Sequence, residues 1–139
     1  MRPIRLLPAL WLMSSTIPAD ACHLDVSLLE LPPSARVARL EACAEQGHAL
    51  ALLVLADQYL HGEGLPRDTA RAADYYRRAA EAGIPRAQLQ YGIMLLDGEG
   101  VTQDSSEALE WIFRARQQGY GPAGEVFDYL MAHPEPLDC

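Results

Sequence analysis

The chain has 139 residues and a formal net charge of −8, and all 11 of its basic residues are arginine. Half of the residues are hydrophobic, a composition typical of one ordered domain rather than of a disordered chain. Proteins bind nucleic-acid backbones and anionic lipid surfaces with clusters of basic residues, which an acidic chain without lysine lacks. We therefore expect no nucleic-acid partner, whereas a basic protein partner would suit the charge.

The first 21 residues have the features of a secretion signal. Arg2 and Arg5 give a positive start, residues 6–13 form a short apolar run, and residues 19–21 (Ala-Asp-Ala) fit the small-x-small rule for cleavage. The run is too short for the ~20 apolar residues that span a bilayer. A buried N-terminal helix is the alternative, and the two prolines after residue 7 count against it. We expect a signal peptide over 1–21, export to the periplasm and no membrane span.

Cleavage at this site leaves Cys22 as the first mature residue. A lipid anchor on Cys22 is an alternative, but Ala19 stands where a bacterial lipobox usually has leucine, and Asp20 follows it. In an exported protein we expect Cys22 and Cys43 to form a disulfide that closes a loop of about twenty residues and contributes about 3 kcal/mol. Cys139 is then the odd cysteine. The other reading is that all three cysteines are incidental.

Residues 22–33 form an apolar arm that allows one or two turns of helix before its final prolines. Ser34 is expected to cap a helix over 35–46, which Gly47 ends.

One short pattern then occurs twice, at residues 59–68 and 95–104, and sets the organisation of the chain. The repeat-defining residues, spaced by 36 between copies, are Gly62, Gly64, Asp68 and Gly83 in the first copy and Gly98, Gly100, Asp104 and Gly119 in the second. A fixed period of this size indicates stacked supersecondary units.

The first full unit is expected over about 48–83, with helices over 49–61 and 69–82. A Gly-Glu-Gly loop joins them because glycine accepts the positive backbone dihedrals of a tight reversal. Asp68 is expected to cap the second helix.

The second unit is expected over about 84–119, where Asp104 and Glu107 predict a capping box for its second helix. A last helix over 123–132 would be the first helix of an unfinished third unit. Ala56 and Gly92 occupy equivalent positions, at which only a small residue lets the two helices of a unit approach.

The repeated pattern resembles the Sel-1-like repeat family, relatives of the tetratricopeptide repeat. The matching residues are Ala49, Ala51, Leu55, Tyr59, Gly62, Gly64, Asp68, Ala72, Tyr75, Ala79, Ala80 and Gly83, then Ala87, Gly92, Gly98, Gly100, Val101, Asp104, Ala108, Trp111, Ala115 and Gly119. Departures are Ala56 for glycine, Leu65 for valine, and an exchange of Tyr91 and Leu95. The resemblance covers about 35–132 and implies an all-α fold, a short right-handed α-α superhelix (solenoid) of two full repeats flanked by half repeats.

The resemblance also implies a binding or adaptor role, common in bacterial envelope proteins, and no catalysis. Some family members carry a disulfide within each repeat. This chain lacks that cysteine spacing, so the activity of that subgroup is not carried over.

The residues themselves indicate no enzyme, metal or cofactor. Four scattered histidines (His23, His48, His61 and His133) have no second ligand at helical spacing. Glu63 and Glu99, in equivalent loops, are interpreted as solvated charges rather than as a catalytic pair. The aromatic residues Tyr75, Tyr76 and Trp111 are interpreted as core rather than as a stacking platform.

One face of the first helices is more apolar than open solvent favours in a small monomer. Its predicted residues, a candidate partner-binding groove, are Leu50, Leu53, Asp57, Leu60, Arg86, Leu89, Ile93 and Leu96. The arm at Leu24–Leu31, a second copy, or a helix or strand of a partner would cover it.

We expect an exported adaptor with a signal peptide (1–21), an arm (22–33), a repeat domain (34–132) and a tail (133–139). An immunity-type protein that neutralises an envelope-acting toxin is the alternative, and a small hydrolase is the outside alternative.

Overall fold

The computed structural model describes Cys22 and residues 27–134. Within them lie seven helices and no strand: α1 (Ser27–Glu30), α2 (Pro33–Glu45), α3 (Ala49–His61), α4 (Thr69–Glu81), α5 (Pro85–Asp97), α6 (Ser105–Gln117) and α7 (Gly121–Ala132). The predicted signal peptide, His23, Leu24 and Cys139 lie outside the described residues. The three helices whose bounds were predicted from residue 49 onward, α3, α4 and α7, follow those bounds within two residues.

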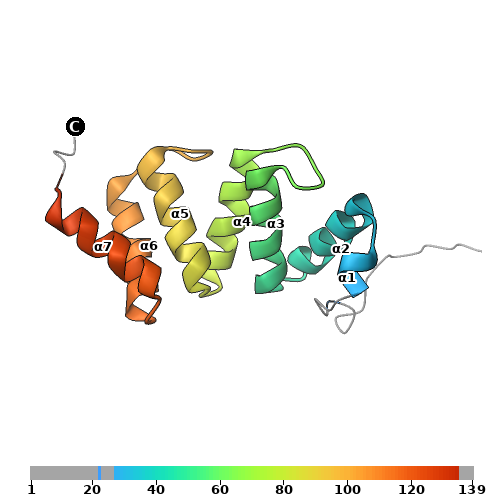
Figure 1. The fold of residues 1–139 in the computed structure, drawn as a ribbon, viewed down its shortest axis with the longest axis horizontal. Coiled ribbons are helices and arrows are strands. Elements are labelled where there is room, and N and C mark those ends of the chain that lie inside the picture. Colours follow the sequence, from blue (N-terminus) through green and yellow to red (C-terminus); the bar gives the residue numbers. More distant parts are fainter. Residues whose placement is uncertain (1–21, 23–26, 135–139) are drawn as a thin grey trace, which may run out of the picture.

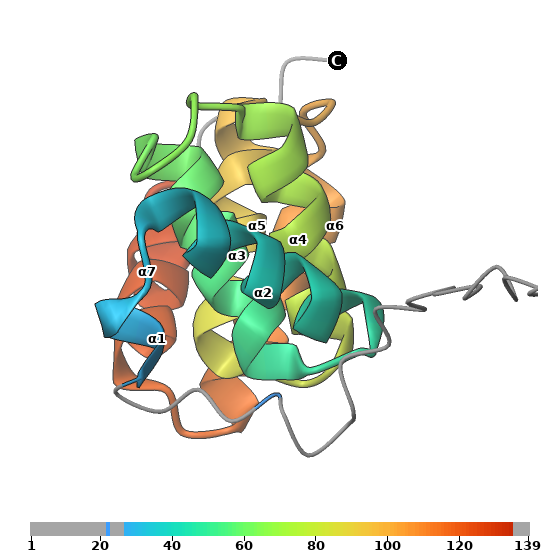
Figure 2. The same ribbon diagram turned by 90° about the vertical axis from the view of Figure 1, so that its right-hand side faces the viewer.

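The helices from α2 to α7 pack in sequence order, each mainly against its neighbours along the chain, and form an α-solenoid (Figure 1). Viewed along the stack, α3, α5 and α7 form one row and α2, α4 and α6 form the other (Figure 2). We call these the A row and the B row. The short α1 lies on the side of the A row, next to the start of the stack.

Aspartate caps begin both B-row helices of the full units. The backbone N–H of Arg71 donates to Oδ1 of Asp68 at 3.0 Å, and that of Glu107 donates to Oδ1 of Asp104 at 2.9 Å. These two caps are confirmed. The predicted cap at Ser34 is wrong, because α2 begins one residue earlier, at Pro33, with no side-chain cap.

Only one of the two hydrogen bonds of the predicted capping box of α6 forms, the one from the Glu107 N–H to Asp104. The Asp104 N–H donates to the carbonyl of Leu95 at 3.0 Å, so it is not free for the Glu107 carboxylate. Glu107 instead accepts a hydrogen bond from Nε1 of Trp111 at 3.1 Å. A loop-to-helix hydrogen bond has taken the place of the reciprocal cap.

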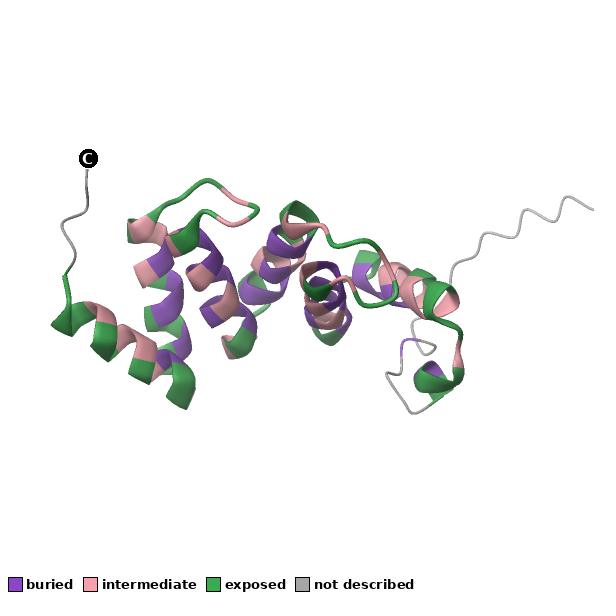
Figure 3. Cartoon of the chain, turned by 45° about the horizontal axis from the view of Figure 1, so that its top comes forward, coloured by how far each residue is buried: buried purple, intermediate pink, exposed green. Residues whose placement is uncertain are grey.

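The core lies between the two rows, where the buried surfaces of the helices face one another (Figure 3). Small residues permit this close approach. Ala56 is fully buried, and a Cβ on Gly92 would lie 2.7 Å from Cγ1 of Ile112 and 3.0 Å from the carbonyl oxygen of Ala108. The small-residue positions predicted from the repeat are therefore confirmed.

Each full unit buries one aromatic pair across its two helices. Tyr59 stacks on Tyr75 with ring centroids 5.7 Å apart, and Tyr91 meets Trp111 edge to face at 6.0 Å. Residues 75 and 111 are equivalent, so the exchange of tyrosine and leucine in the A row moves the partner ring without removing the pair. Tyr76 is fully buried as well. The aromatic residues belong to the core, as predicted.

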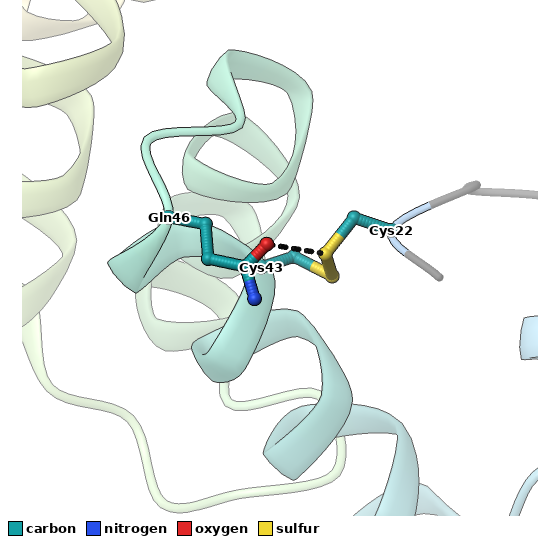
Figure 4. Close-up of a disulfide and its surroundings, with 3 residues drawn as sticks. All are labelled: Cys22, Cys43 and Gln46. Atoms are coloured by element: carbon teal, nitrogen blue, oxygen red, sulfur yellow. Dashed lines mark hydrogen bonds between the residues drawn. A yellow bond between two sulfur atoms is a disulfide. The ribbon is translucent and has the colours of Figure 1, made fainter. Parts of the chain in front are cut away.

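A disulfide between Cys22 and Cys43 joins the arm to α2, with Cα atoms 5.5 Å apart (Figure 4). A sulfur of this bond lies 3.7 Å from Oε1 of Gln46. Since a disulfide sulfur carries no hydrogen, this is a packing contact. Leu28 of the arm is buried in the main core, and Arg36 donates to the arm carbonyl of Leu31 at 3.2 Å.

Candidate functional site

Both glycines of each Gly-x-Gly loop have positive φ angles, and these angles produce the turn. Gly62 and Gly98 end α3 and α5 in the left-handed conformation, with φ of 72° and 68°. Gly64 and Gly100 follow with φ of 80° and 70°. Side chains other than glycine rarely adopt such angles. The repeated stretch is thus a turn between the helices of a unit.

The loops also join one unit to the next. A Cβ on Gly100 would lie 2.2 Å from the carbonyl oxygen of Thr69, and one on Gly64 would lie 3.1 Å from Cβ of Pro33. Thr69 and Pro33 begin α4 and α2. Each loop therefore lies directly on the first turn of the B-row helix of the preceding unit.

The two loop glutamates, Glu63 and Glu99, have different surroundings. Glu99 forms an ion pair with Arg67 of the preceding loop at 2.5 Å, and both side chains are largely exposed. Glu63 is exposed in its own loop. These contacts support the interpretation of solvated loop charges.

The eight residues of the predicted groove fall into three groups. Leu50 and Arg86 are exposed; Asp57, Leu60, Ile93 and Leu96 are partly buried; Leu53 and Leu89 are buried. Leu53 and Leu89, each 8 % exposed, are corrections, because they cannot line an open surface. Leu53 belongs to the main core that includes Leu28 of the arm, and Leu89 packs in a cluster with Ala123 of α7.

A polar network that the sequence did not predict crosses the first junction between units. The Tyr76 hydroxyl of α4 donates to Oδ1 of Asp57 on α3. Arg86 of α5 pairs with the other oxygen of Asp57 at 2.7 Å. Burial, followed by the bond to Asp57, raises the pKa of Tyr76 far above its usual range. The network holds the exposed guanidinium of Arg86 in one place.

The second junction does not repeat this network among the described residues, although Arg116 of α6 pairs with Asp128 of α7 at 3.1 Å. Ile93, Ile112 and Pro122 stand at the positions equivalent to Asp57, Tyr76 and Arg86. There α7 covers α5 with apolar side chains, including Val126 and Leu130.

Two side chains near the start of the stack, Gln58 and Arg36, each have a buried polar atom without a hydrogen-bond partner among the described residues. Gln58 is 9 % exposed, and its Oε1 has no hydrogen-bond partner among the described residues, nor has Nε of Arg36. Both residues line a cavity of about 120 Å³. One repeat later the equivalent residues are apolar: Ala72 replaces Arg36 and Met94 replaces Gln58.

A larger groove of about 430 Å³ lies at the far end of the stack, between α5, α6 and α7. We call it the terminal groove. Its lining residues are Leu96, Asp97, Gln103, Ser105, Leu109, Leu130, Met131, His133 and Pro134. Sequence reasoning identified only Leu96 among them. One feature of the sequence could have indicated this groove. Among the predicted helices, the last one (123–132) has no second helix of its unit to pack against.

The described residues contain neither a candidate metal site nor a candidate membrane-spanning helix. No group of three or more His, Cys, Asp and Glu side chains within residue 22 and residues 27–134 could hold a metal ion. In the same part of the chain, no helix has the length and apolar character needed to cross a membrane.

Comparison with solved structures finds the same fold in bacterial proteins. The Sel1 repeat protein from Oxalobacter formigenes superimposes with a TM-score of 0.67 at 29 % identity, and the match covers 69 % of this chain and 40 % of that one. A protective antigen present in uropathogenic Escherichia coli strains, which displays an SLR fold, gives 0.60 at 38 % identity, covering 63 % and 19 %. The chain thus spans less than half the length of these two proteins.

A third structure, Helicobacter pylori cysteine rich protein B, matches with a TM-score of 0.66 at 21 % identity, covering 70 % of this chain and 74 % of that one. At this identity the likeness concerns the fold alone. A search of curated proteins finds no significant match.

The family model of the Sel1 repeat matches residues 49–84 and 85–120, one residue later than the expected units. Together the two matches cover more than half of the chain, and their boundaries coincide with the starts of α3 and α5. The chain therefore belongs to the Sel1 repeat family.

Proposed function

We propose that the protein is an exported interaction module that binds another protein through its A row. Sel1-like repeat folds generally mediate protein interactions. The observation that carries the proposal is the pair formed by Leu50 and Arg86, which are 60 % and 57 % exposed at equivalent positions in the first turns of α3 and α5.

This pair offers a partner two different contacts. Leu50 presents an apolar side chain, and Arg86 presents a guanidinium that Asp57 already orients. An oriented arginine loses little further conformational freedom on binding, and arginine is frequent among residues that dominate interface energies. Leu60, Ile93 and Leu96, which are partly buried, would form the floor of the surface, while Leu53 and Leu89 support it from the core.

The charge of the chain limits the class of partner. A net charge of −8 favours association with a basic protein, and salt weakens such attraction. The predicted signal peptide places the encounter in the periplasm, and the Cys22–Cys43 disulfide suits an oxidising compartment.

Affinity capture from an envelope extract tests the proposal. The mature protein should retain a specific protein, with less retained as salt rises. Leu50→Asp and Arg86→Ala should each reduce recovery at least severalfold, since both side chains are exposed, and circular dichroism of each variant should show that its helices are retained. Glu110→Ala, at an exposed position on α6 in the B row, is the matched control and should bind like the wild type. Recovery of no specific protein at any salt concentration would contradict the proposal.

A second candidate is an immunity-type protein that neutralises a toxin acting in the envelope. The strong negative charge on a small chain favours it, because it complements a basic effector. A strain without the protein would then be inhibited by wild-type siblings in contact culture. Growth equal to that of the wild type in this assay would leave only the adaptor role.

A lipid anchor at Cys22 competes with the disulfide for one sulfur atom. Because this sulfur is bonded to Cys43 in the structure, we propose an unanchored mature protein. Mass spectrometry of the mature N-terminus should find Cys22 without lipid, and a diacylglyceryl mass on Cys22 would reverse the assignment.

A further inference from the structure

The terminal groove lies at a position that is filled twice elsewhere in the stack. At the first junction between units, the Gly100 backbone lies on Thr69, and Val101 packs against the main core. At the start of the stack, Gly64 lies on Pro33, and Leu65 packs against the same core. A glycine turn followed by an aliphatic residue thus covers the first turn of α2 and of α4.

The first turn of α6 is the third position of this series. Ser105 is equivalent to Thr69 and Pro33, and it lines the terminal groove together with Leu109. Within the described residues no loop covers it. Pro134 stands at the position of Gly98 and cannot open a turn in the way that Gly98 does. Proline holds φ near −65°, whereas Gly98 has φ of 68°.

We propose that the terminal groove binds a turn of a partner protein that has the sequence glycine, any residue, glycine, then leucine or valine. This inference rests on the proposed function, protein binding, and names the chemistry that one part of the surface recognises. The aliphatic side chain enters the apolar groove between Leu109 and Leu130, as Val101 enters the core one unit earlier. The glycines let the backbone of the partner lie on the first turn of α6.

The charge at the terminal groove determines which residue between the two glycines of the partner binds best. At the first junction this residue is Glu99, and it pairs with Arg67. Gln103 stands at the equivalent position to Arg67 and donates to the carbonyl of Leu96 at 2.6 Å. Asp97 also lines the groove and makes no ion pair among the described residues. A basic residue between the glycines therefore binds better than an acidic one.

Titration of the isotope-labelled mature chain with short peptides, followed by NMR, tests this. The probe is acetyl-Gly-Arg-Gly-Leu-Pro-amide. It should give saturable shifts confined to the terminal groove, with an affinity severalfold higher than that of the Gly-Glu-Gly-Leu-Pro peptide. High salt should remove most of this difference. A Gly-Arg-Gly-Asp-Pro peptide should produce no saturable shifts, since it lacks the aliphatic side chain.

Two variants control for folding and for position. Met131→Asp places a charge in the groove at an exposed side chain and should abolish binding while leaving the helical circular dichroism unchanged. Leu50→Asp lies outside the groove and should bind the peptide like the wild type.

Three results would overturn the inference. Saturable shifts could be missing at several millimolar peptide. Binding could occur only after deletion of residues 135–139, which would make the chain's own tail the occupant. Shifts in the groove could follow protein concentration without peptide, which would make a second copy the occupant. Partner capture that persists while peptide binding fails would sink the groove inference alone and leave the proposed function standing.

Discussion

Glycines with the same backbone angle differ in what surrounds them. Gly100 and Gly119 have φ of 70° and 79°. A Cβ on Gly119 would meet nothing within 4 Å, whereas one on Gly100 would collide with Thr69. The sequence pattern treats the two positions alike, and only the contact between units separates them.

Alanine at these positions should therefore cost different amounts. Gly119→Ala should lower the free energy of unfolding by about 1–2 kcal/mol, the cost of the left-handed conformation. Gly100→Ala should lose about 1–3 kcal/mol more, because the loop must also move away from α4. Urea unfolding of both variants measures the difference. Equal losses would mean that the loop does not lie on Thr69.

The two buried glutamines, Gln58 and Gln88, differ in whether their amide groups are paired. Gln88 is satisfied, since its Nε2 donates to the carbonyl of Ala80 and its Oε1 accepts from Gln118. Gln58 leaves its Oε1 unpaired among the described residues. An unpaired buried polar atom costs free energy that an apolar side chain of similar shape avoids.

Substitution of each glutamine by methionine tests this difference. Methionine is chosen because Met94 is the residue equivalent to Gln58 in the second unit. Gln58→Met should raise the free energy of unfolding by about 1 kcal/mol. Gln88→Met should lower it by about 1 kcal/mol, because it removes one hydrogen bond to the Ala80 carbonyl, which then keeps the backbone N–H of Gly83. Thermal or urea unfolding gives both values. A loss of stability in Gln58→Met would show that its amide is satisfied in solution.

At the scale of elements, the two junctions between units use different chemistry. The first joins α3, α4 and α5 through Asp57, Tyr76 and Arg86, and the second packs α7 on α5 through apolar contacts. At equivalent positions, Asp57 thus pairs with Arg86 at the first junction, whereas Ile93 packs among apolar side chains at the second.

Alkaline pH should weaken the first junction. The folded state raises the pKa of Tyr76 above the unfolded value of 10.0, so the folded state keeps the proton that the unfolded state loses. Stability is fully present below pH 10 and falls as the pH rises further. Tyr76→Phe removes this contribution, so its free energy of unfolding should fall less steeply above pH 10.

Urea titrations between pH 8 and 11 compare the wild type with Tyr76→Phe. Burial also raises the pKa of Tyr59, Tyr75 and Tyr91, so the slope of the variant should be reduced rather than abolished. Identical slopes for the two proteins would contradict the predicted role of the Tyr76 hydroxyl.

At the scale of the whole molecule, the stack is closed at one end and open at the other. The arm, with the buried Leu28 and the Cys22–Cys43 disulfide, covers the start. At the far end, α7 has no B-row helix among the described residues, and the side chains of Tyr129 and Met131 remain exposed. Within the described residues, the first helices of the stack are therefore covered and the last helix is covered on one side only.

Removal of the disulfide should loosen the closed end. Cys22→Ser with Cys43→Ser should lower the free energy of unfolding by about 3 kcal/mol, as expected for a loop of this length. The helical content should remain, because the family-defining units begin after α2. Cys139→Ala is the control and should unfold like the wild type. Urea unfolding with and without reductant measures the effect, and no change on reduction would mean that the disulfide does not form.

The sequence by itself determined the period, the two full units, the approximate bounds of α3, α4 and α7, the Asp68 and Asp104 caps and the small positions at Ala56 and Gly92. These features depend on signals within a few residues, such as a left-handed glycine or a capping carboxylate, or on an exact spacing. The sequence left the pairing of Cys22 with Cys43 as one expectation beside incidental cysteines, and the structure contains the disulfide.

Only the tertiary structure decided which A-row residues face solvent. Leu53 and Leu50 lie on the same helix, yet one is buried because the arm and neighbouring helices cover it. The Asp57–Arg86 pair joins residues 29 positions apart, and the terminal groove joins three helices. Such relations depend on how successive units are placed against one another, which the periodic pattern within each unit does not specify.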